Sequence, residues 1–198
     1  CLKRAGVTDI ISLSAVGSLK EEYMPGNFVL VDQFIDRTVS REKTFFGEGC
    51  VAHVSFSHPI SDRLQHALHN TCLDLGLPSH LGGTYICMEG PQFSTLAESN
   101  LYRSWGCDVI GMTNMPEAKL AREAELPYAT VAMVTDYDCW HPDHEAVSVE
   151  SVIKVIEKNR DNANLLLKNA LPRIKVRPNE DIQGGDRALD FAIVTSPE

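Results

Sequence analysis

The sequence contains no apolar run that approaches the roughly 20 residues needed to cross a membrane. It also lacks an excess of positive charge, because 18 Lys and Arg residues stand against 27 Asp and Glu, for a net charge of −9. A surface of that sign repels the phosphate backbone of a nucleic acid. These absences argue against membrane-spanning and nucleic-acid-binding proteins. No apolar secretory segment follows the N-terminus either, so we expect a cytoplasmic protein.

Cysteine is present, but without the spacing of a disulfide or metal framework. The six cysteines are far apart, at positions 1, 50, 72, 87, 107 and 139, and no two form a CxxC pair. We interpret them as free thiols, mostly in the core. A metal site would have only Cys139, His141 and His144 as clustered ligands, and we expect none.

An initiator Met is also missing. Residues 1–6, CLKRAG, are typical of the end of a helix, with Gly6 as the terminating residue. Because the start of that helix is not in the chain, we interpret the sequence as N-terminally incomplete. Its length of 198 residues still suffices for one domain with a sizeable core.

Short apolar segments alternate with amphipathic helices along most of the chain. Ser61 is a predicted N-cap, and Thr95 with Glu98 has the spacing of a capping box. Residues 37–58 lack periodicity and predict an extended loop. The alternation predicts an α/β domain over 1–171, with helices on both faces of a mixed or parallel sheet, and a divergent tail over 172–198. The pattern predicts strands over 9–15, 28–34, 84–88, 108–112 and 128–135, and helices over 61–76, 95–106, 116–125 and 148–171.

Polar side chains gather where three of the predicted strands end. Ser14 precedes exposed backbone amides, Thr113 precedes a helix N-terminus, and Asp136 and Asp138 follow a buried strand. Hydroxyls and amides in such places can receive an oxyanion, and ligands of α/β sheets collect at the carboxyl ends of strands. Each feature also has a structural explanation, as an ordinary turn, a helix cap or a pair of buried acids. The residues alone leave both explanations open.

Three long motifs follow one another at close spacing: MEGPQFSTLAES at 88–99, MTNMPEAKLARE at 112–123 and AMVTDYDCW at 132–140. Together with the earlier AVGSLKEEYMPGNFVLVDQFIDRT, they make residues 1–171 resemble the purine nucleoside phosphorylase superfamily. Within it, the match is to the eukaryotic methylthioadenosine phosphorylases. The resemblance implies a three-layer α/β fold with a mixed central sheet flanked by helices.

That family cleaves the N-glycosidic bond of 5′-methylthioadenosine with inorganic phosphate, in purine and methionine salvage. The resemblance therefore implies a pentosyltransferase that releases adenine and 5-methylthioribose-1-phosphate and uses no metal or organic cofactor. It also implies a homotrimer with active sites near subunit contacts, located in the cytoplasm and also in the nucleus.

The resemblance also assigns roles to individual residues. Asp136 and Asp138 would be catalytic, with Asp136 at purine N7 and the 6-amino group, where an acid stabilises the negative charge that develops as the bond breaks. Phosphate would bind at Ser14, Ala15 and Thr113. The nucleoside-binding residues it implies are Phe93, Ser94, Met112, Val147, Val149, Val152 and Ile153, with His53 reaching in from a neighbouring subunit.

The choice of base can be argued from two of these positions. Relatives that act on 6-oxopurines have Asn in place of Asp136 and Glu in place of Ser94. A 6-amino group is a donor that needs an acceptor, and a mismatch leaves a buried polar group unpaired. Asp136 with Ser94 therefore favours adenine. Gly111 departs from the family, which usually has Asn there, toward the oxopurine relatives.

The family's glycine-rich phosphate loop and its Arg-His phosphate contact have no counterpart in the sequence. We therefore expect the chain alone to be inactive or nearly so. Two other functional classes stay open: a hydrolytic nucleosidase, which would use water, and a non-catalytic fragment or splice product that binds purines or subunits. The paired hydroxyls of Ser14 and Thr113 favour phosphate over water as the nucleophile.

Overall fold

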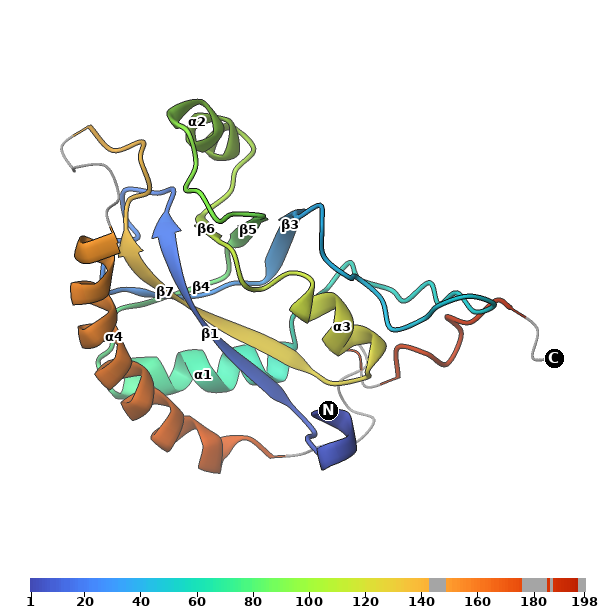
Figure 1. The fold of residues 1–198 in the computed structure, drawn as a ribbon. Coiled ribbons are helices and arrows are strands. Elements are labelled where there is room, and N and C mark those ends of the chain that lie inside the picture. The colour runs from blue at the N-terminus through green and yellow to red at the C-terminus, as the bar shows by residue number, and fades with distance from the viewer. Residues whose placement is uncertain (143–148, 176–184, 186, 196–198) are drawn as a thin grey trace.

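A seven-stranded mixed sheet forms the centre of the protein (Figure 1). The computed structural model describes residues 1–142, 149–175, 185 and 187–195. Within these residues the strand order is β3-β5-β6-β1-β7-β2-β4. The strands are β1 (Ile10–Ser18), β2 (Phe28–Leu30), β3 (Gln33–Arg37), β4 (Ser79–Leu81), β5 (Thr84–Met88), β6 (Val109–Gly111) and β7 (Tyr128–Asp136).

The two longest strands, β1 and β7, lie side by side near the middle of the sheet. They run parallel, with Ile10 opposite Tyr128, whereas β6 pairs with β1 and β2 pairs with β7 in the antiparallel sense. β7 is buried along most of its length, as expected of a strand covered on both faces. The α/β class and the mixed sheet expected from the sequence are confirmed.

Helices cover both sides of this sheet. Leu64 and Leu68 of the first helix share a core cluster with Leu166 of the last and with Val131 of β7, and each fully buried side chain of this kind contributes about 1.5–3 kcal/mol. Figure 1 shows α1 and α4 together on one side, α3 on the other, and α2 beyond the ends of β5 and β6. The helices are α1 (Asp62–Asp74), α2 (Leu96–Ser104), α3 (Glu117–Glu123) and α4 (Val149–Ala170), with short 3-10 turns η1 (Lys3–Ala5) and η2 (Leu171–Arg173).

Two predicted helix starts are confirmed, whereas the start predicted at Ser148 lies outside the described residues. Ser61 Oγ accepts a hydrogen bond from the Leu64 N–H, and Thr95 and Glu98 form a reciprocal capping box. The predicted loop is also confirmed, because the only regular pairing described between β3 and α1 is an isolated bridge from Ala52 to Ile193.

Two strand predictions are wrong in their limits. β1 continues to Ser18 because Gly17 and Ser18 pair with β6. The segment 28–34 is two strands, since the chain leaves β2 after Leu30 and the Asp32 N–H donates to the Gly83 carbonyl, which turns the chain toward β5. The sequence pattern also missed β4, which is only three residues long.

Candidate functional site

A cavity of about 250 Å³ opens where β1, β5, β6 and β7 end. It brings together six of the site residues predicted from the sequence, although they lie up to 123 positions apart in the chain. The lining residues are Ala15, Val16, Gly17, Met88, Phe93, Ile110, Gly111, Met112, Thr113, Thr135, Asp136 and Asp138.

A register shift between Val16 and Gly17 shapes the acidic part of this cavity. It places Gly17 opposite Asp136 in the β1–β7 pair. A Cβ at Gly17 would lie 2.9 Å from Asp136 Oδ1 and 3.3 Å from the Asp138 nitrogen. Glycine is therefore needed at this position because the carboxylate approaches the backbone closely.

Both oxygens of Asp136 are engaged. Thr135 Oγ1 lies 2.6 Å from Oδ2, and the Asp138 N–H donates to Oδ1 at 2.8 Å. Burial raises the pKa of Asp136 above its ordinary value, against the lowering effect of these two donors. A carboxyl with a raised pKa in a cavity is a candidate proton donor.

Asp138 is 6% exposed and adopts a left-handed backbone with φ of 52°. Burial is the main cause that raises its pKa as well. The Cys139 thiol donates to the Ser94 carbonyl at 3.4 Å, which ties this turn to the segment that follows β5. Ser94 itself is buried and its hydroxyl lies 3.6 Å from Met88 Sδ, so it stands behind the cavity wall.

Hydroxyl groups form the second polar part of the site. Ser14 Oγ lies 2.8 Å from Thr113 Oγ1 and 3.1 Å from Tyr85 Oη. Ser14 is buried, whereas Thr113 and Ala15 are exposed to the cavity. Burial raises the pKa of Tyr85, so this phenol stays neutral and can donate a hydrogen bond.

Gly111 has a structural reason to differ from its usual family counterpart. A Cβ at this position would lie 2.0 Å from Tyr85 Oη and 2.7 Å from Tyr85 Cζ. Because the phenol that contacts Ser14 occupies this space, a side chain at position 111 and Tyr85 in its present place are incompatible.

Arg41 links the segments around the cavity, and it was not among the residues singled out from the sequence. Its Nη1 donates to the carbonyls of Met112 at 2.7 Å and Met115 at 2.5 Å. Its Nη2 donates to the Glu89 carbonyl at 2.8 Å, and its Nε bonds the Glu89 carboxylate at 3.1 Å. One guanidinium thus joins the segments that follow β5 and β6.

Of the residues predicted for the 5′ pocket, only Ile153 has a described side chain, and it is not among the described residues that line this cavity. Val147 lies outside the described residues, and Val149 and Val152 are described only as backbone of α4. Ile153 is half-exposed. The candidate ligand His144 also lies outside the described residues, and within them no three His, Cys, Asp or Glu side chains are grouped to hold a metal ion.

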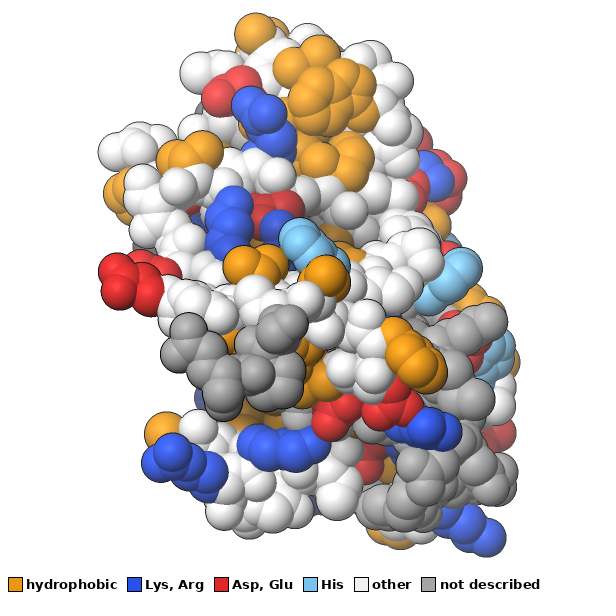
Figure 2. All heavy atoms as spheres, turned by 90° about the vertical axis from the view of Figure 1, so that its right-hand side faces the viewer, with side chains coloured by type: hydrophobic (Ala, Val, Ile, Leu, Met, Phe, Trp, Pro, Cys, Tyr) orange, Lys and Arg blue, Asp and Glu red, His pale blue; other side chains and the backbone are white. Residues whose placement is uncertain are grey.

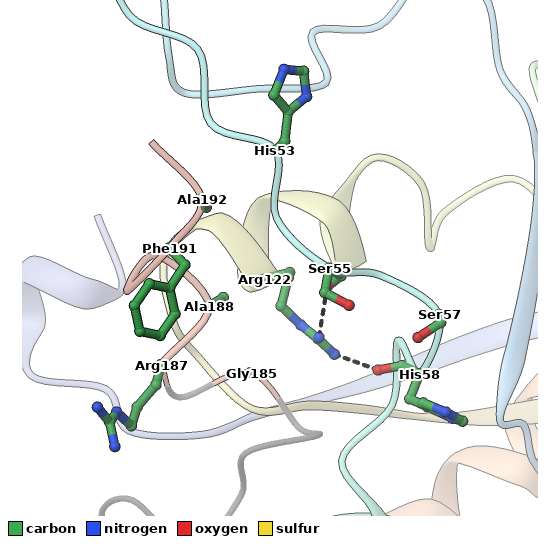
Figure 3. Close-up of a pocket in the computed structure, with 10 residues that line it drawn as sticks. All are labelled: His53, Ser55, Ser57, His58, Arg122, Gly185, Arg187, Ala188, Phe191 and Ala192. Carbon is green, nitrogen blue, oxygen red and sulfur yellow. Dashed lines mark hydrogen bonds between the residues drawn. The ribbon is translucent and has the colours of Figure 1, made fainter. Parts of the chain in front are cut away.

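His53 belongs to the loop between β3 and α1, and this loop projects from the sheet at the right of Figure 1. Its N–H donates to the Ala192 carbonyl at 2.8 Å, which joins the long loop to the C-terminal segment. It lines a second cavity of about 420 Å³, in which Arg122 donates to the carbonyls of Ser55 and His58 (Figure 3). In that view the His53 ring points away from Arg122.

The end of the molecule that carries this region exposes apolar side chains. Phe191 is 96% exposed, and Phe45, Val51 and Val194 are each more than half-exposed. Figure 2 looks onto this end and shows hydrophobic side chains among basic and acidic groups. In the part of the chain that is described, no helix has the length and apolarity required to cross a membrane.

Comparison with known proteins places the chain among phosphorylases. The family model described as "Phosphorylase superfamily" matches residues 1–172. S-methyl-5′-thioadenosine phosphorylase of Rhodospirillum rubrum is 63% identical over 197 residues, which is 100% of this chain and 67% of the relative. The protein of the same name from Bradyrhizobium diazoefficiens is 62% identical over 198 residues, again 100% of this chain and 68% of the relative. This chain thus spans about two thirds of their length.

Solved structures give the same picture. A methylthioadenosine phosphorylase from an antarctic soil metagenomic library has a TM-score of 0.91 and 48% identity, over 98% of this chain and 68% of that one. Methylthioadenosine phosphorylase from Schistosoma mansoni, in complex with adenine, has a TM-score of 0.91 and 31% identity, over 96% of this chain and 74% of that one. Because the two bacterial relatives are about twice as similar in sequence as the Schistosoma protein, the resemblance is not confined to eukaryotic members.

Proposed function

The chain belongs to the phosphorylase superfamily, and we propose that it cleaves the N-glycosidic bond of 5′-methylthioadenosine with inorganic phosphate. The products would be adenine and 5-methylthioribose-1-phosphate. The observation that carries the proposal is one cavity with two kinds of polar group: the partly buried Asp136 with the buried Asp138, and the Ser14–Thr113 hydroxyl pair. Relatives that are 63% and 62% identical carry the name of this activity.

The acids suit the purine. As the glycosidic bond stretches, negative charge grows on the base, and a proton held near N7 stabilises it. Burial raises the pKa of Asp136, which favours its protonated form in the cavity. Asp136 is therefore the residue that would share its proton with purine N7.

The hydroxyls suit phosphate as the second substrate. Ser14 and Thr113 offer oxygens 2.8 Å apart, and Thr113 and Ala15 face the cavity. Phosphate bound there would attack C1′ and stabilise the positive charge of the sugar, so positioning and electrostatics would dominate the rate. The reaction needs no metal or organic cofactor in this proposal.

The preference for adenine rests on Asp136, whose carboxyl accepts from a 6-amino group, and on Ser94 behind the wall. Phe93 and Met112 line the cavity as flat and flexible apolar surfaces for the base and the ribose. We propose that the 5′-methylthio group of the nucleoside contacts an apolar pocket formed by Val147, Val149, Val152 and Ile153.

We further propose a homotrimer in the cytoplasm, with His53 contributing to the site of a neighbouring subunit. His53 projects from the body with the long loop, and the same end exposes Phe45 and Phe191. Apolar side chains of this size are typical of surfaces that pack against another chain.

The test is release of adenine from methylthioadenosine by the purified chain, with and without phosphate, and with inosine as the control nucleoside. Binding of adenine and of hypoxanthine is measured in parallel by calorimetry. We expect adenine to bind more tightly than hypoxanthine, and any release to require phosphate. Release without phosphate would show a nucleosidase and overturn the proposal. Adenine binding without release under either condition would agree with the expected inactivity of residues 1–198 alone, and tighter binding of hypoxanthine than of adenine would overturn the choice of base.

A further inference from the structure

A continuous line of hydrogen-bonded side chains runs from Tyr85 to helix α3. Beyond the contacts of Ser14 with Tyr85 and Thr113, Thr113 Oγ1 lies 3.1 Å from Asn114 Oδ1. Asn114 Nδ2 lies 3.1 Å from Tyr128 Oη, which in turn lies 2.7 Å from Glu117 Oε1. Asn114 and Tyr128 are 0% and 1% exposed, so water cannot replace the bonds between them.

The last member of this line sets the direction of all the others. A carboxylate only accepts hydrogen bonds, so the Tyr128 hydroxyl gives its one hydrogen to Glu117. Burial raises the pKa of Tyr128 well above its ordinary value, which keeps the phenol protonated. Tyr128 Oη can then only accept from Asn114, which fixes the amide with its NH₂ toward Tyr128 and its oxygen toward Thr113.

The direction continues into the cavity. The Thr113 hydroxyl gives its one hydrogen to Asn114 Oδ1, so Thr113 Oγ1 accepts from Ser14. Ser14 in turn accepts from Tyr85, whose oxygen also faces the Thr113 N–H at 3.5 Å. Both hydroxyls expected to donate to phosphate therefore have their hydrogens committed along the line before phosphate arrives.

We infer that Asn114, Tyr128 and Glu117 are positioning residues that direct the hydroxyl hydrogens of Thr113 and Ser14 away from the oxyanion. The inference rests on the proposed function, because it concerns the phosphate half of that site. An oxyanion that accepts from Thr113 must break the bond to Asn114. Reversing the whole line would free the hydrogens, but Tyr128 would then lose its bond to Glu117.

The orientation of the Asn114 amide is the first test. In the full-length chain without phosphate, nuclear Overhauser contacts from the Asn114 NH₂ should reach the Tyr128 ring protons. Contacts from that NH₂ to the Thr113 methyl group in their place would overturn the inference. This measurement does not depend on turnover or on phosphate.

The second test is titration of inorganic phosphate into two complementary variants. Glu117→Gln removes the charge of an exposed residue and keeps the Tyr128 hydroxyl, whereas Tyr128→Phe keeps the charge and removes the hydroxyl. Both changes let the Asn114 amide turn and free the Thr113 hydrogen. Both variants should therefore bind phosphate about two- to tenfold more tightly than the parent, because one neutral hydrogen bond changes a binding affinity by about this factor. Their affinity for adenine should be unchanged.

A simple charge effect gives a different result. Under a charge effect, Glu117→Gln would tighten phosphate binding and Tyr128→Phe would not. The tighter binding of Glu117→Gln would also weaken at high salt. This pattern would overturn the inference. If the line acts through Thr113, the double variant Thr113→Val/Glu117→Gln should bind phosphate no better than Thr113→Val. If neither the parent nor any variant binds phosphate, the proposed phosphate site is rejected. If the protein binds phosphate but the Asn114 NH₂ faces Thr113, only the inference is rejected.

Discussion

The two polar parts of the cavity are built on different principles. The acidic part holds two carboxyls, the partly buried Asp136 and the buried Asp138, and desolvation raises the pKa of each. The hydroxyl part is neutral, and its groups are linked to one another by short contacts that start at Ser14 and Thr113. No Lys or Arg is among the described residues that line the cavity.

This difference implies that the two parts respond to different changes. The acidic part depends on where protons are bound, so it should be sensitive to pH and to loss of a carboxyl. The hydroxyl part depends on which way each hydrogen points, so it should be sensitive to changes in distant partners such as Glu117. The first kind of change alters the protonation of groups in the cavity, and the second alters the direction of the hydrogen bonds made by its hydroxyls.

The largest effect is expected from Asp136→Asn. The amide keeps the shape but cannot supply a proton to N7, and its NH₂ opposes the 6-amino group of adenine. We expect adenine release to fall by a factor of about 10² to 10³, with adenine binding weakened more than hypoxanthine binding. Steady-state kinetics and calorimetry on the two bases measure these changes. Asp161→Asn, at an exposed position, is the matched control, and equal losses for both bases would contradict the role given to Asp136.

Arg41→Lys should affect both parts at once. The guanidinium joins the carbonyls of Met112, Met115 and Glu89, and an ammonium group cannot span all three. We expect affinities for adenine and for phosphate to fall together, by about tenfold, the equivalent of one charged hydrogen bond or more. Calorimetry with each ligand tests this, with Arg173→Lys, which pairs with Asp74 away from the cavity, as the control. Loss of only one affinity would show that Arg41 serves one part.

The contrast between Asp136 and Arg41 also shows what could be predicted from the sequence. Asp136 ends β7 and Thr113 follows the end of β6 by two residues, so the principle that ligands gather at strand ends made both of them candidates, while the residues alone left a structural explanation open. Arg41 lies in a loop without periodicity. Three of its partners are backbone carbonyls, which every residue type has, so the sequence cannot indicate them. The register shift at Gly17 was equally hidden, since strand pairing depends on contacts between distant segments.

The space beside Tyr85 gives a prediction of intermediate size. Gly111→Ala would place a methyl group 2.0 Å from Tyr85 Oη, so the ring must move away from Ser14. We expect a loss of about 1–3 kcal/mol in the free energy of unfolding, measured by urea denaturation. Tyr85→Phe removes the oxygen but not the ring, so the double variant should recover part of the loss. Strict additivity of the two changes would show that the contact is not the cause.

Asp138→Asn should have a smaller effect that depends on pH. Because the folded-state pKa of Asp138 is raised, the unfolded chain releases this proton at lower pH than the folded one, and stability falls as pH rises between the two values. Asn carries no such penalty and tolerates the left-handed backbone at φ of 52°. At neutral pH the free energy of unfolding of the variant should exceed that of the parent by about 1 kcal/mol, a common size for the effect of one substitution. At about pH 3 the two should be equally stable. Thermal denaturation at both pH values tests this, and an equal gain at both would argue against titration as the cause.

The smallest effect on the cavity itself is expected from His53→Ala. His53 lies with the long loop and the C-terminal segment, and it does not line the cavity that holds Asp136. Adenine affinity should therefore change by less than about twofold, which is within 0.5 kcal/mol. If His53 reaches the site of a neighbouring subunit, the KM for methylthioadenosine should rise, because only the nucleoside carries the 5′ substituent. That rise should be absent when the enzyme is diluted until the subunits separate. A change in adenine affinity of tenfold or more would mean that His53 contacts the base, and this would contradict the position of its loop away from the cavity that holds Asp136.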